Sequence, residues 1–234
     1  MEDKEKIINA IEIYNKGEQL EAEDKFEEAF KAYEEAAKLN YNKALFKVGH
    51  FYRFGLGVDK DLIKAMNYFQ KAVKSGNVDA MQNIGIMYYS GEGVEKSYEE
   101  AKIWFKKAAK LGDKFSCNRL GNMYFYGTGM EPDYVKALKW YKAGEKLNHE
   151  VCVRNIGYLY EIGKGVVQDY KKALCYYKKA AALNDEIALE RIGDMYFNGF
   201  GVEKDIYEAV KWYKNAAYFG SKSANVKLSN IDNK

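Results

Sequence analysis

Apolar residues recur along most of the chain at intervals of three and four positions, which is the period of a helix with one buried face. Charged residues occupy many of the positions between them. Short stretches rich in Gly, Asn and Asp interrupt this pattern, and the chain has a single proline, Pro132. The pattern therefore predicts helices almost throughout, joined by short turns, and leaves little room for a β-sheet.

The interruptions belong to an internal repeat with a constant length of 36 residues. A glycine marks the first helix of every unit: Gly49, Gly85, Gly121, Gly157 and Gly193. An aliphatic residue precedes each of these glycines, and a tyrosine follows three positions later. A small residue lies five positions before each: Ala44, Ala80, Ser116, Cys152 and Ala188. These positions share one helical face, which we expect to be buried in close contact with another helix.

Each first helix leads into a G-x-G pair and an apolar residue, where the chain is expected to turn back because glycine accepts positive φ without steric cost. Three positions further on are the expected N-caps of second helices: Asp61, Ser97, Asp133, Asp169 and Asp205. The second helices are expected to end in the left-handed conformation at Gly76, Gly112, Asn148, Asn184 and Gly220. Five hairpins, or ten helices, follow from these signals.

Aromatic pairs lie at the centre of the second helices, with small residues on either side. The pairs are Tyr68/Phe69, Trp104/Phe105, Trp140/Tyr141, Tyr176/Tyr177 and Trp212/Tyr213. A buried aromatic side chain removes about 150 to 250 Å² from water, so we expect each pair to fill the space between successive hairpins. Replacing Trp140 by Ala is then expected to cost about 3 to 5 kcal/mol through the cavity that remains.

The unit A-x-x-x-[LIV]-G-x-x-Y-x-x-G-x-G-V-x-x-D-x-x-x-A-x-x-[WY]-[FY]-x-x-A-A resembles the Sel-one-like repeat (SLR), a relative of the tetratricopeptide repeat. The resemblance gives five hairpins, at residues 43–78, 79–114, 115–150, 151–186 and 187–220. Met130-Glu131-Pro132 and Gly144-Glu145 depart from the pattern, and we expect them to loosen or re-aim one hairpin without changing the fold. Residues 1–40 resemble a tetratricopeptide hairpin, and residues 221–234 are expected to form a capping helix and tail. The resemblance implies an all-α solenoid of tandem helix-turn-helix repeats, an alpha-alpha superhelix.

Charge is distributed unevenly along the chain. Residues 1–40 hold 6 lysines and 12 acidic residues, a net charge of −6, whereas the remainder has a net charge of +9. The basic residues alternate with acidic ones along the helices, which is typical of a solvated face, so we do not expect nucleic acid as a partner. No segment approaches 18 apolar residues, and the N-terminus lacks the apolar core of a signal peptide. We therefore expect a cytoplasmic protein without a membrane partner.

Candidate chemistry is sparse. Cys117, Cys152 and Cys175 follow no zinc or C-x-x-C spacing, so we expect free thiols, buried or half-buried, with no metal and no cofactor. The G-x-G loop lacks the third glycine of a dinucleotide-binding unit and the G-K-[ST] of a P-loop. Some bacterial proteins that resemble the SLR family have been described as β-lactamases or penicillin binders, but none of the seven serines has a lysine three positions later. We expect a protein that is not an enzyme, with a hydrolase or a penicillin-binding/β-lactamase-like enzyme as the alternative.

Positions that vary between units are candidates for recognition, because the constant ones are needed for packing. Positions −6, −3, +1 and +4 from the repeat glycine lie away from the buried face, and in tetratricopeptide-like solenoids that face lines the concave groove. The expected protein-binding residues are Gln82, Tyr89, Asn118, Asn122, Phe125, Arg154, Asn155, Tyr158, Glu190, Asp194 and Phe197. Aromatics supply contact area, and Asn and Gln can hydrogen-bond a peptide backbone. The aromatics at +4, Tyr89, Phe125 and Phe197, have an alternative role in packing against the next hairpin.

The function predicted from these features is that of a non-catalytic scaffold or adaptor that binds a protein or an extended peptide. The resemblance implies the same, since SLR proteins commonly act as scaffolds in signalling, in assembly or quality-control complexes, and in bacterial interaction with competitors or hosts. The abundance of Lys, Asn, Ile and Tyr suits an AT-rich bacterial genome. A bacterial immunity or effector-antagonist protein is one variant of this function, because it needs only a rigid binding surface.

Overall fold

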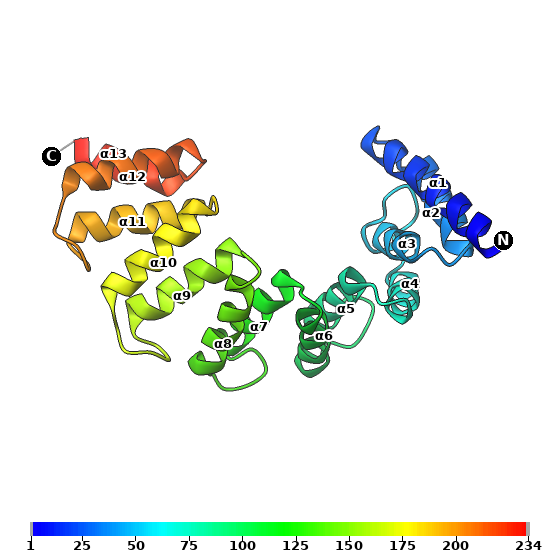
Figure 1. The fold of residues 1–234 in the computed structure, drawn as a ribbon, viewed down its shortest axis with the longest axis horizontal. Helices are drawn as coiled ribbons and strands as arrows, with labels where there is room; N and C mark the ends of the chain where they lie inside the picture. Colours follow the sequence, from blue (N-terminus) through cyan, green and yellow to red (C-terminus); the bar gives the residue numbers. More distant parts are fainter. Residues whose placement is uncertain (1, 233–234) are drawn as a thin grey trace. The chain divides into compact units, whose positions relative to one another are not determined.

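The computed structural model describes residues 2–232 and contains thirteen α-helices and no β-strand in that range (Figure 1). The chain divides between Asp113 and Lys114 into two compact units. The first unit contains α1 (Glu2–Ala22), α2 (Phe26–Lys38), α3 (Asn42–Phe54), α4 (Leu62–Lys74), α5 (Val78–Ser90) and α6 (Tyr98–Lys110). The second contains α7 (Lys114–Tyr126), α8 (Tyr134–Glu145), α9 (Glu150–Ile162), α10 (Tyr170–Ala182), α11 (Glu186–Asn198), α12 (Ile206–Tyr218) and α13 (Lys222–Asp232).

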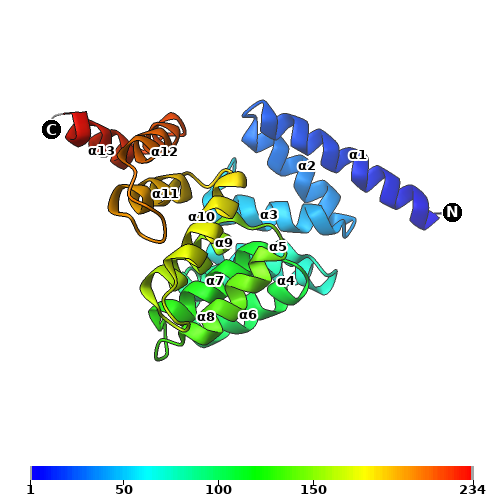
Figure 2. The same cartoon turned by 60° about the vertical axis from the view of Figure 1, so that its left-hand side comes forward.

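Consecutive helices form hairpins within each unit, and α13 packs against α12 at the C-terminal end (Figures 1 and 2). Most helices have 13 residues, but α1 has 21, and its N-terminal part extends past the end of α2 (Figure 2). The all-α fold of tandem helical hairpins expected from the repeat is therefore confirmed. No helix within residues 2–232 has the length and apolar character needed to cross a membrane.

The predicted turn signals are confirmed in all five repeats. Both glycines of every G-x-G pair have positive φ, and so do the five residues expected to end the second helices. Each expected N-cap accepts a backbone hydrogen bond from the third residue of its helix, as at Asp61, where the Oδ1–N distance to Lys64 is 2.9 Å. The backbone N–H of each cap also donates to the carbonyl of the repeat tyrosine before the loop, as from Asp61 to Tyr52 at 2.9 Å. Each loop is thus closed by hydrogen bonds at both ends.

The repeat glycine makes room for the aromatic ring of the paired second helix. A Cβ at Gly121 would lie 2.2 Å from Cε1 of Tyr141, and the same ring position faces the repeat glycine in every hairpin. The second member of each aromatic pair is therefore fully buried, whereas the first member, including Trp140, is only half-buried. The first member nevertheless packs where the hairpins meet, since the cluster beside Trp140 contains Tyr141 of its own hairpin and Ile156 of the next. Its partial burial places it at the edge of the core.

Two buried positions were not identified from the sequence. The residues two positions after the repeat glycine are almost completely buried: Phe51, Met87, Met123, Leu159 and Met195. The residues four positions before it are also buried: Leu45, Met81, Cys117, Val153 and Leu189. Both positions vary among apolar types of different shape, so a comparison based on identical letters passes over them.

The second unit holds the departures from the repeat pattern. A Cβ at Gly144 would lie 2.3 Å from Sγ of Cys152, so the glycine provides space for that sulfur. Helix α8 has 12 residues and ends at Glu145. Cys117 and Cys152 are buried as expected, but Cys175 is exposed because it lies on the outer side of α10. His149 is the buried N-cap residue of α9, with its ring centroid 5.1 Å from that of Phe115.

Within each unit, loops also lie on the preceding hairpin, at Gly57, Gly93, Gly165 and Gly201. The second glycine of a G-x-G pair approaches the N-terminal turn of the preceding second helix, and a Cβ at Gly201 would lie 2.6 Å from the carbonyl carbon of Tyr170. The ring of Phe200, between the two glycines, stacks on the ring of Tyr170 at 4.9 Å. Lys164 takes the same position in the preceding repeat and donates to the Tyr134 hydroxyl at 2.9 Å. These contacts set the spacing of successive first helices.

Candidate protein-binding site

The predicted binding residues lie on the first helices, at positions that the core does not use. We call the set at −3, +1 and +4 from the repeat glycine, together with Asn155 at −2, the first-helix face. All eleven predicted residues are half-buried, and none is fully buried or fully exposed. Gln82 and Tyr89 belong to the first unit, and the other nine belong to the second. The fold therefore leaves one side of each of these residues accessible.

Asn118, Asn122, Arg154 and Asn155 all have partners within the second unit. Nδ2 of Asn155 donates to Oδ1 of Asn118 at 3.2 Å, and Oδ1 of Asn122 accepts from the Tyr141 hydroxyl at 2.8 Å. The guanidinium of Arg154 lies 3.3 Å from the carboxylate of Asp185, which is buried and also caps α11. These side chains are therefore held in fixed orientations.

A recurring arrangement on this face joins a phenol, a carboxylate and a cation. In the last repeat, Asp194 accepts from the Tyr213 hydroxyl at 2.8 Å and from Lys227 at 2.6 Å. Lys227 also lies 2.6 Å from Glu190. Burial alone would raise the pKa of Glu190, but hydrogen bonds from Lys227 and two serines outweigh it and lower the pKa below its ordinary value. The carboxylates are thus supplied with donors from inside the protein.

The same arrangement is found in two other hairpins. Glu161 accepts from the Tyr177 hydroxyl and lies 3.9 Å from Arg191. In the first unit, Glu21 accepts from the Tyr33 hydroxyl at 2.5 Å and from Lys47 at 2.7 Å. Burial raises the pKa of Tyr33, Tyr177 and Tyr213, and the adjacent carboxylates raise it further. These hydroxyls therefore remain protonated donors.

Apart from Asn155, the residues that supply most of these partners were not identified from the sequence. They lie two residues before the repeat glycine, or before Ser229 in α13, and they contact the preceding hairpin: Lys47, Asn83, Asn155, Arg191 and Lys227. In the first unit, the buried Arg53 donates to Asn83 at 2.7 Å and to Glu92 at 2.8 Å. These contacts could have been inferred from the sequence, because a Lys or Arg at −2 recurs together with an acidic residue in the preceding repeat. We call this series of contacts the inter-repeat ladder.

Aromatic side chains form a cluster beside the ladder in the second unit. The ring centroid of Phe125 lies 4.9 Å from that of Tyr126, 5.4 Å from that of Tyr134 and 5.9 Å from that of Tyr158. Phe125 thus contacts the next hairpin through Tyr158, which agrees with the packing alternative. Tyr126 has 72% of its surface exposed. In the first unit, Tyr89 packs against Tyr98 of its own hairpin, with centroids 5.2 Å apart.

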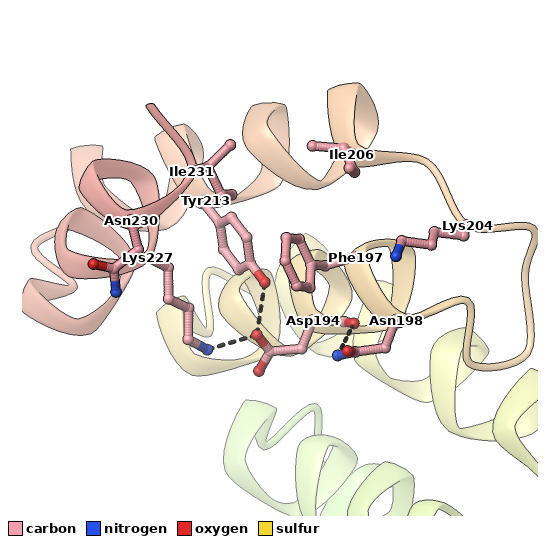
Figure 3. A pocket seen from close by; sticks show the side chains of 9 residues that line it. All are labelled: Asp194, Phe197, Asn198, Lys204, Ile206, Tyr213, Lys227, Asn230 and Ile231. Atoms are coloured by element: carbon pink, nitrogen blue, oxygen red, sulfur yellow. Dashed lines mark hydrogen bonds and ion pairs between the residues drawn. The ribbon is translucent and has the colours of Figure 1, made fainter. Parts of the chain in front are cut away.

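A pocket of about 680 Å³ lies at the C-terminal end of the face (Figure 3). It is lined by Asp194, Phe197, Asn198, Lys204, Ile206, Tyr213, Lys227, Asn230 and Ile231. Figure 3 shows the hydrogen bonds of Asp194 on one side of the pocket and the rings of Phe197 and Tyr213 beside it. Lys204 extends over the Phe197 ring, with Nζ 5.8 Å from the centroid. Two of the predicted residues, Asp194 and Phe197, therefore line the same concavity.

No group of three or more His, Cys, Asp or Glu side chains in the described part of the chain is arranged to hold a metal ion. The groups that the first-helix face does offer are amide and carboxylate hydrogen-bonding groups in fixed positions, aromatic surface, and an apolar pocket with lysines at its rim. This combination is suited to recognition of a polypeptide, where aromatic area supplies affinity and fixed polar groups supply orientation.

The fold and this face define a helical-repeat protein of the tetratricopeptide-like class. A family model for the Sel1 repeat matches residues 42–77, 78–113, 114–149, 152–185 and 187–218. These matches cover more than half of the chain, so the chain belongs to the Sel1 repeat family. The resemblance inferred from the repeat motif is thereby confirmed.

Solved structures of the same fold include two with clear sequence similarity. A Sel1 repeat protein from Oxalobacter formigenes is 32% identical, with a TM-score of 0.86 over 94% of this chain and 90% of that one. A protective antigen present in uropathogenic Escherichia coli strains, which displays an SLR fold, is 31% identical, with a TM-score of 0.80 over 88% of this chain. The match spans only 44% of the length of the E. coli protein.

An immunity protein from Pseudomonas aeruginosa is 21% identical, with a TM-score of 0.57 over 90% of this chain and 81% of that one. At this level of identity, the likeness shows the fold alone. Comparison with curated proteins gives no match.

Proposed function

We propose that the protein is a non-catalytic scaffold that binds a protein or an extended peptide along the first-helix face. The cluster of Phe125, Tyr126, Tyr134 and Tyr158 carries this proposal, because it places aromatic surface beside fixed hydrogen-bonding groups. The neighbouring Asn118 and Asn155 amides are held in position by each other. Rigid aromatic side chains next to oriented polar groups are the usual composition of a binding hot spot. The Sel1 repeat family, whose members are generally repeat scaffolds, supports the same function.

A triple variant in this cluster, N118A/Y126A/Y158A, tests the proposal. A matched control, V135A/K139A/K171A, changes exposed positions on the second helices α8 and α10. Proteins captured from the native host by the wild-type chain would be purified and their affinities measured for each variant. We expect the cluster variant to bind at least about tenfold more weakly, and the control to bind as the wild type does. Circular dichroism melting would verify that both variants fold.

A purified partner that binds the cluster variant and the wild type equally would show that the first-helix face is not the binding site. Catalysis is tested separately with a chromogenic lactam and a panel of hydrolase substrates. Turnover that is abolished by one substitution on the first-helix face would contradict the non-catalytic part of the proposal.

A narrower form of this function is that of a bacterial immunity or effector-antagonist protein acting in the cytoplasm. Blocking a toxin requires only a rigid surface of the right shape, and an immunity protein from P. aeruginosa uses the same fold. The exposed, unpaired thiol of Cys175 supports a reducing compartment. Capture of a secreted toxin whose activity is inhibited by the wild type, but not by N118A/Y126A/Y158A, would support this form.

A further inference from the structure

Arg191 differs from other cations of the protein in its hydrogen bonding. Four other cations, all buried or half-buried, each donate a hydrogen bond to a carboxylate: Lys47, Arg53, Arg154 and Lys227. The carboxylate of Glu161 lies 3.9 Å from the Arg191 guanidinium, beyond hydrogen-bond distance, and it accepts from the Tyr177 hydroxyl instead. Within the described residues, the N–H groups of Arg191 therefore have no hydrogen-bond acceptor.

Arg191 is also the most accessible of these five cations. Its side chain is 42% exposed, compared with 7% for Arg53 and 18% for Arg154. A guanidinium presents its N–H donors in a rigid plane, which matches the two oxygens of a carboxylate in a pair of parallel hydrogen bonds. Arg191 can therefore bind a carboxylate from another molecule without giving up a hydrogen bond inside the protein.

The guanidinium of Arg191 continues the aromatic cluster of the first-helix face. Its Cζ lies 5.8 Å from the ring centroid of Tyr158, and the Tyr158 ring lies 5.9 Å from that of Phe125. The Phe125 ring in turn contacts the exposed ring of Tyr126 at 4.9 Å. These residues come from the three successive first helices α7, α9 and α11 (Figure 1). An extended segment that crosses this face would therefore meet aromatic surface first and the guanidinium next to it.

A second cation borders the same cluster. Lys164 donates to the Tyr134 hydroxyl at 2.9 Å and lies over the Tyr134 ring, and it forms no ion pair with a carboxylate of the described residues. The acids of the face in this unit all accept hydrogen bonds from inside the protein: Glu161, Glu190 and Asp194. Each carboxylate thus has an internal donor, whereas the two cations beside the cluster have no hydrogen-bonded carboxylate. Negative charge in the partner is therefore favoured.

We propose that Arg191 selects an acidic residue of the partner, a statement that rests on the function proposed above. The partner is then an extended segment of another protein in which Asp or Glu adjoins apolar residues. The carboxylate accepts hydrogen bonds from Arg191, and the apolar residues cover the rings of Phe125, Tyr126 and Tyr158. An amide in place of that carboxylate binds more weakly, because hydrogen bonds that involve ionised groups are roughly twice as strong as neutral ones.

Selection of random-sequence peptides displayed on phage, with the full chain immobilised, tests this inference. The enriched peptides would be synthesised in two forms, with their acidic residues and with the corresponding amides. We expect the enriched peptides to carry Asp or Glu beside apolar residues, and the amide form to bind the wild type at least about tenfold more weakly. R191A should bind both forms equally. K142A is the matched control, since it removes one exposed positive charge from α8 of the same unit and should keep the discrimination.

R191K keeps the charge but not the planar pair of donors, so it should discriminate less than the wild type. It decides the test if circular dichroism shows that R191A does not fold. Enriched peptides without acidic residues, or full discrimination in R191A or R191K, would overturn the role of Arg191. Binding that N118A/Y126A/Y158A still weakens would then leave the proposed function intact. Peptides that bind this triple variant as they bind the wild type would contradict the proposed function itself, and selection that enriches no peptide would contradict both.

Discussion

Position 144 has glycine where the other four repeats have alanine: Ala72, Ala108, Ala180 and Ala216. The small residue that opens the next repeat is correspondingly larger, since Cys152 replaces the alanine or serine found there in the other units. The two changes compensate for each other in volume, because the Cys152 sulfur occupies the space of the missing methyl group. The sequence marked Gly144 as a departure, but the reason for it lies eight residues away on another helix.

Gly144→Ala is therefore expected to destabilise the protein, although alanine has a helix propensity about 1 kcal/mol better than glycine. The added methyl group meets the Cys152 sulfur, and overpacking of this kind costs about 1 to 3 kcal/mol. G144A/C152A should recover most of that loss, since it restores the alanine pair of the other repeats. Denaturant unfolding of both single variants and the double variant measures the coupling. Additive losses would show that the two sites do not share one space.

At the scale of the helix, the aromatic pairs differ in depth. Tyr141 is 2% exposed and lies on the bare backbone of Gly121, whereas Trp140 is half-buried. Tyr141→Ala should cost about 3 to 5 kcal/mol through a closed cavity. Trp140→Ala should cost less, about 1 to 3 kcal/mol, because water can enter the space that the indole leaves. Denaturant unfolding measures which variant loses more free energy of unfolding. A larger loss for Trp140→Ala than for Tyr141→Ala would contradict this prediction.

The start of α11 depends on one buried carboxylate. Asp185 caps the helix through the Ala188 amide at 2.8 Å and pairs with Arg154 on α9. Asp185→Asn retains an oxygen for the cap but loses the charge, whereas Asp185→Ala loses both and leaves Arg154 without its carboxylate. We expect the alanine variant to be less stable than the asparagine variant by about 1 kcal/mol or more. Thermal unfolding compares them, and equal losses would mean that the cap contributes nothing.

The helices and their boundaries were predictable because the residues that begin and end a helix act locally. A positive-φ residue such as Gly55 or Asn148, and a cap such as Asp133, act within a few residues of the chain. The partners on the first-helix face were not predictable in the same way. Whether Asn155 reaches Asn118 depends on how one hairpin is rotated on the next, and the periodicity of a single helix does not determine that rotation.

At the scale of the whole molecule, the ladder makes stability depend on pH. The hydrogen bond from Arg53 lowers the pKa of Glu92 below its ordinary value of 4.5. Hydrogen bonds from Lys47 and Tyr33 outweigh burial and lower the pKa of Glu21. A carboxylate whose pKa is lower in the folded state contributes stability above its unfolded pKa, and that contribution is lost as the pH falls through the folded value.

The free energy of unfolding should therefore decrease below about pH 4.5, before general acid unfolding. Glu92→Gln should be less stable at neutral pH and should show a smaller decrease between about pH 5 and pH 3. Urea unfolding at several pH values measures both effects. A curve for the variant that runs parallel to the wild-type curve would show that Glu92 is not one of the titrating groups.

The inter-repeat ladder also favours the present order of the hairpins that it joins. All five Sel1 units share one length and one core, so their cores alone would allow any order along the chain. The ladder restricts this order, because Lys47 pairs with Glu21 and Arg191 pairs with Glu161 in the hairpin before it. Exchanging the hairpin that supplies Glu21 or Glu161 would leave Lys47 or Arg191 without its carboxylate. Repeats with equivalent cores thus differ in which neighbour their charged residues match.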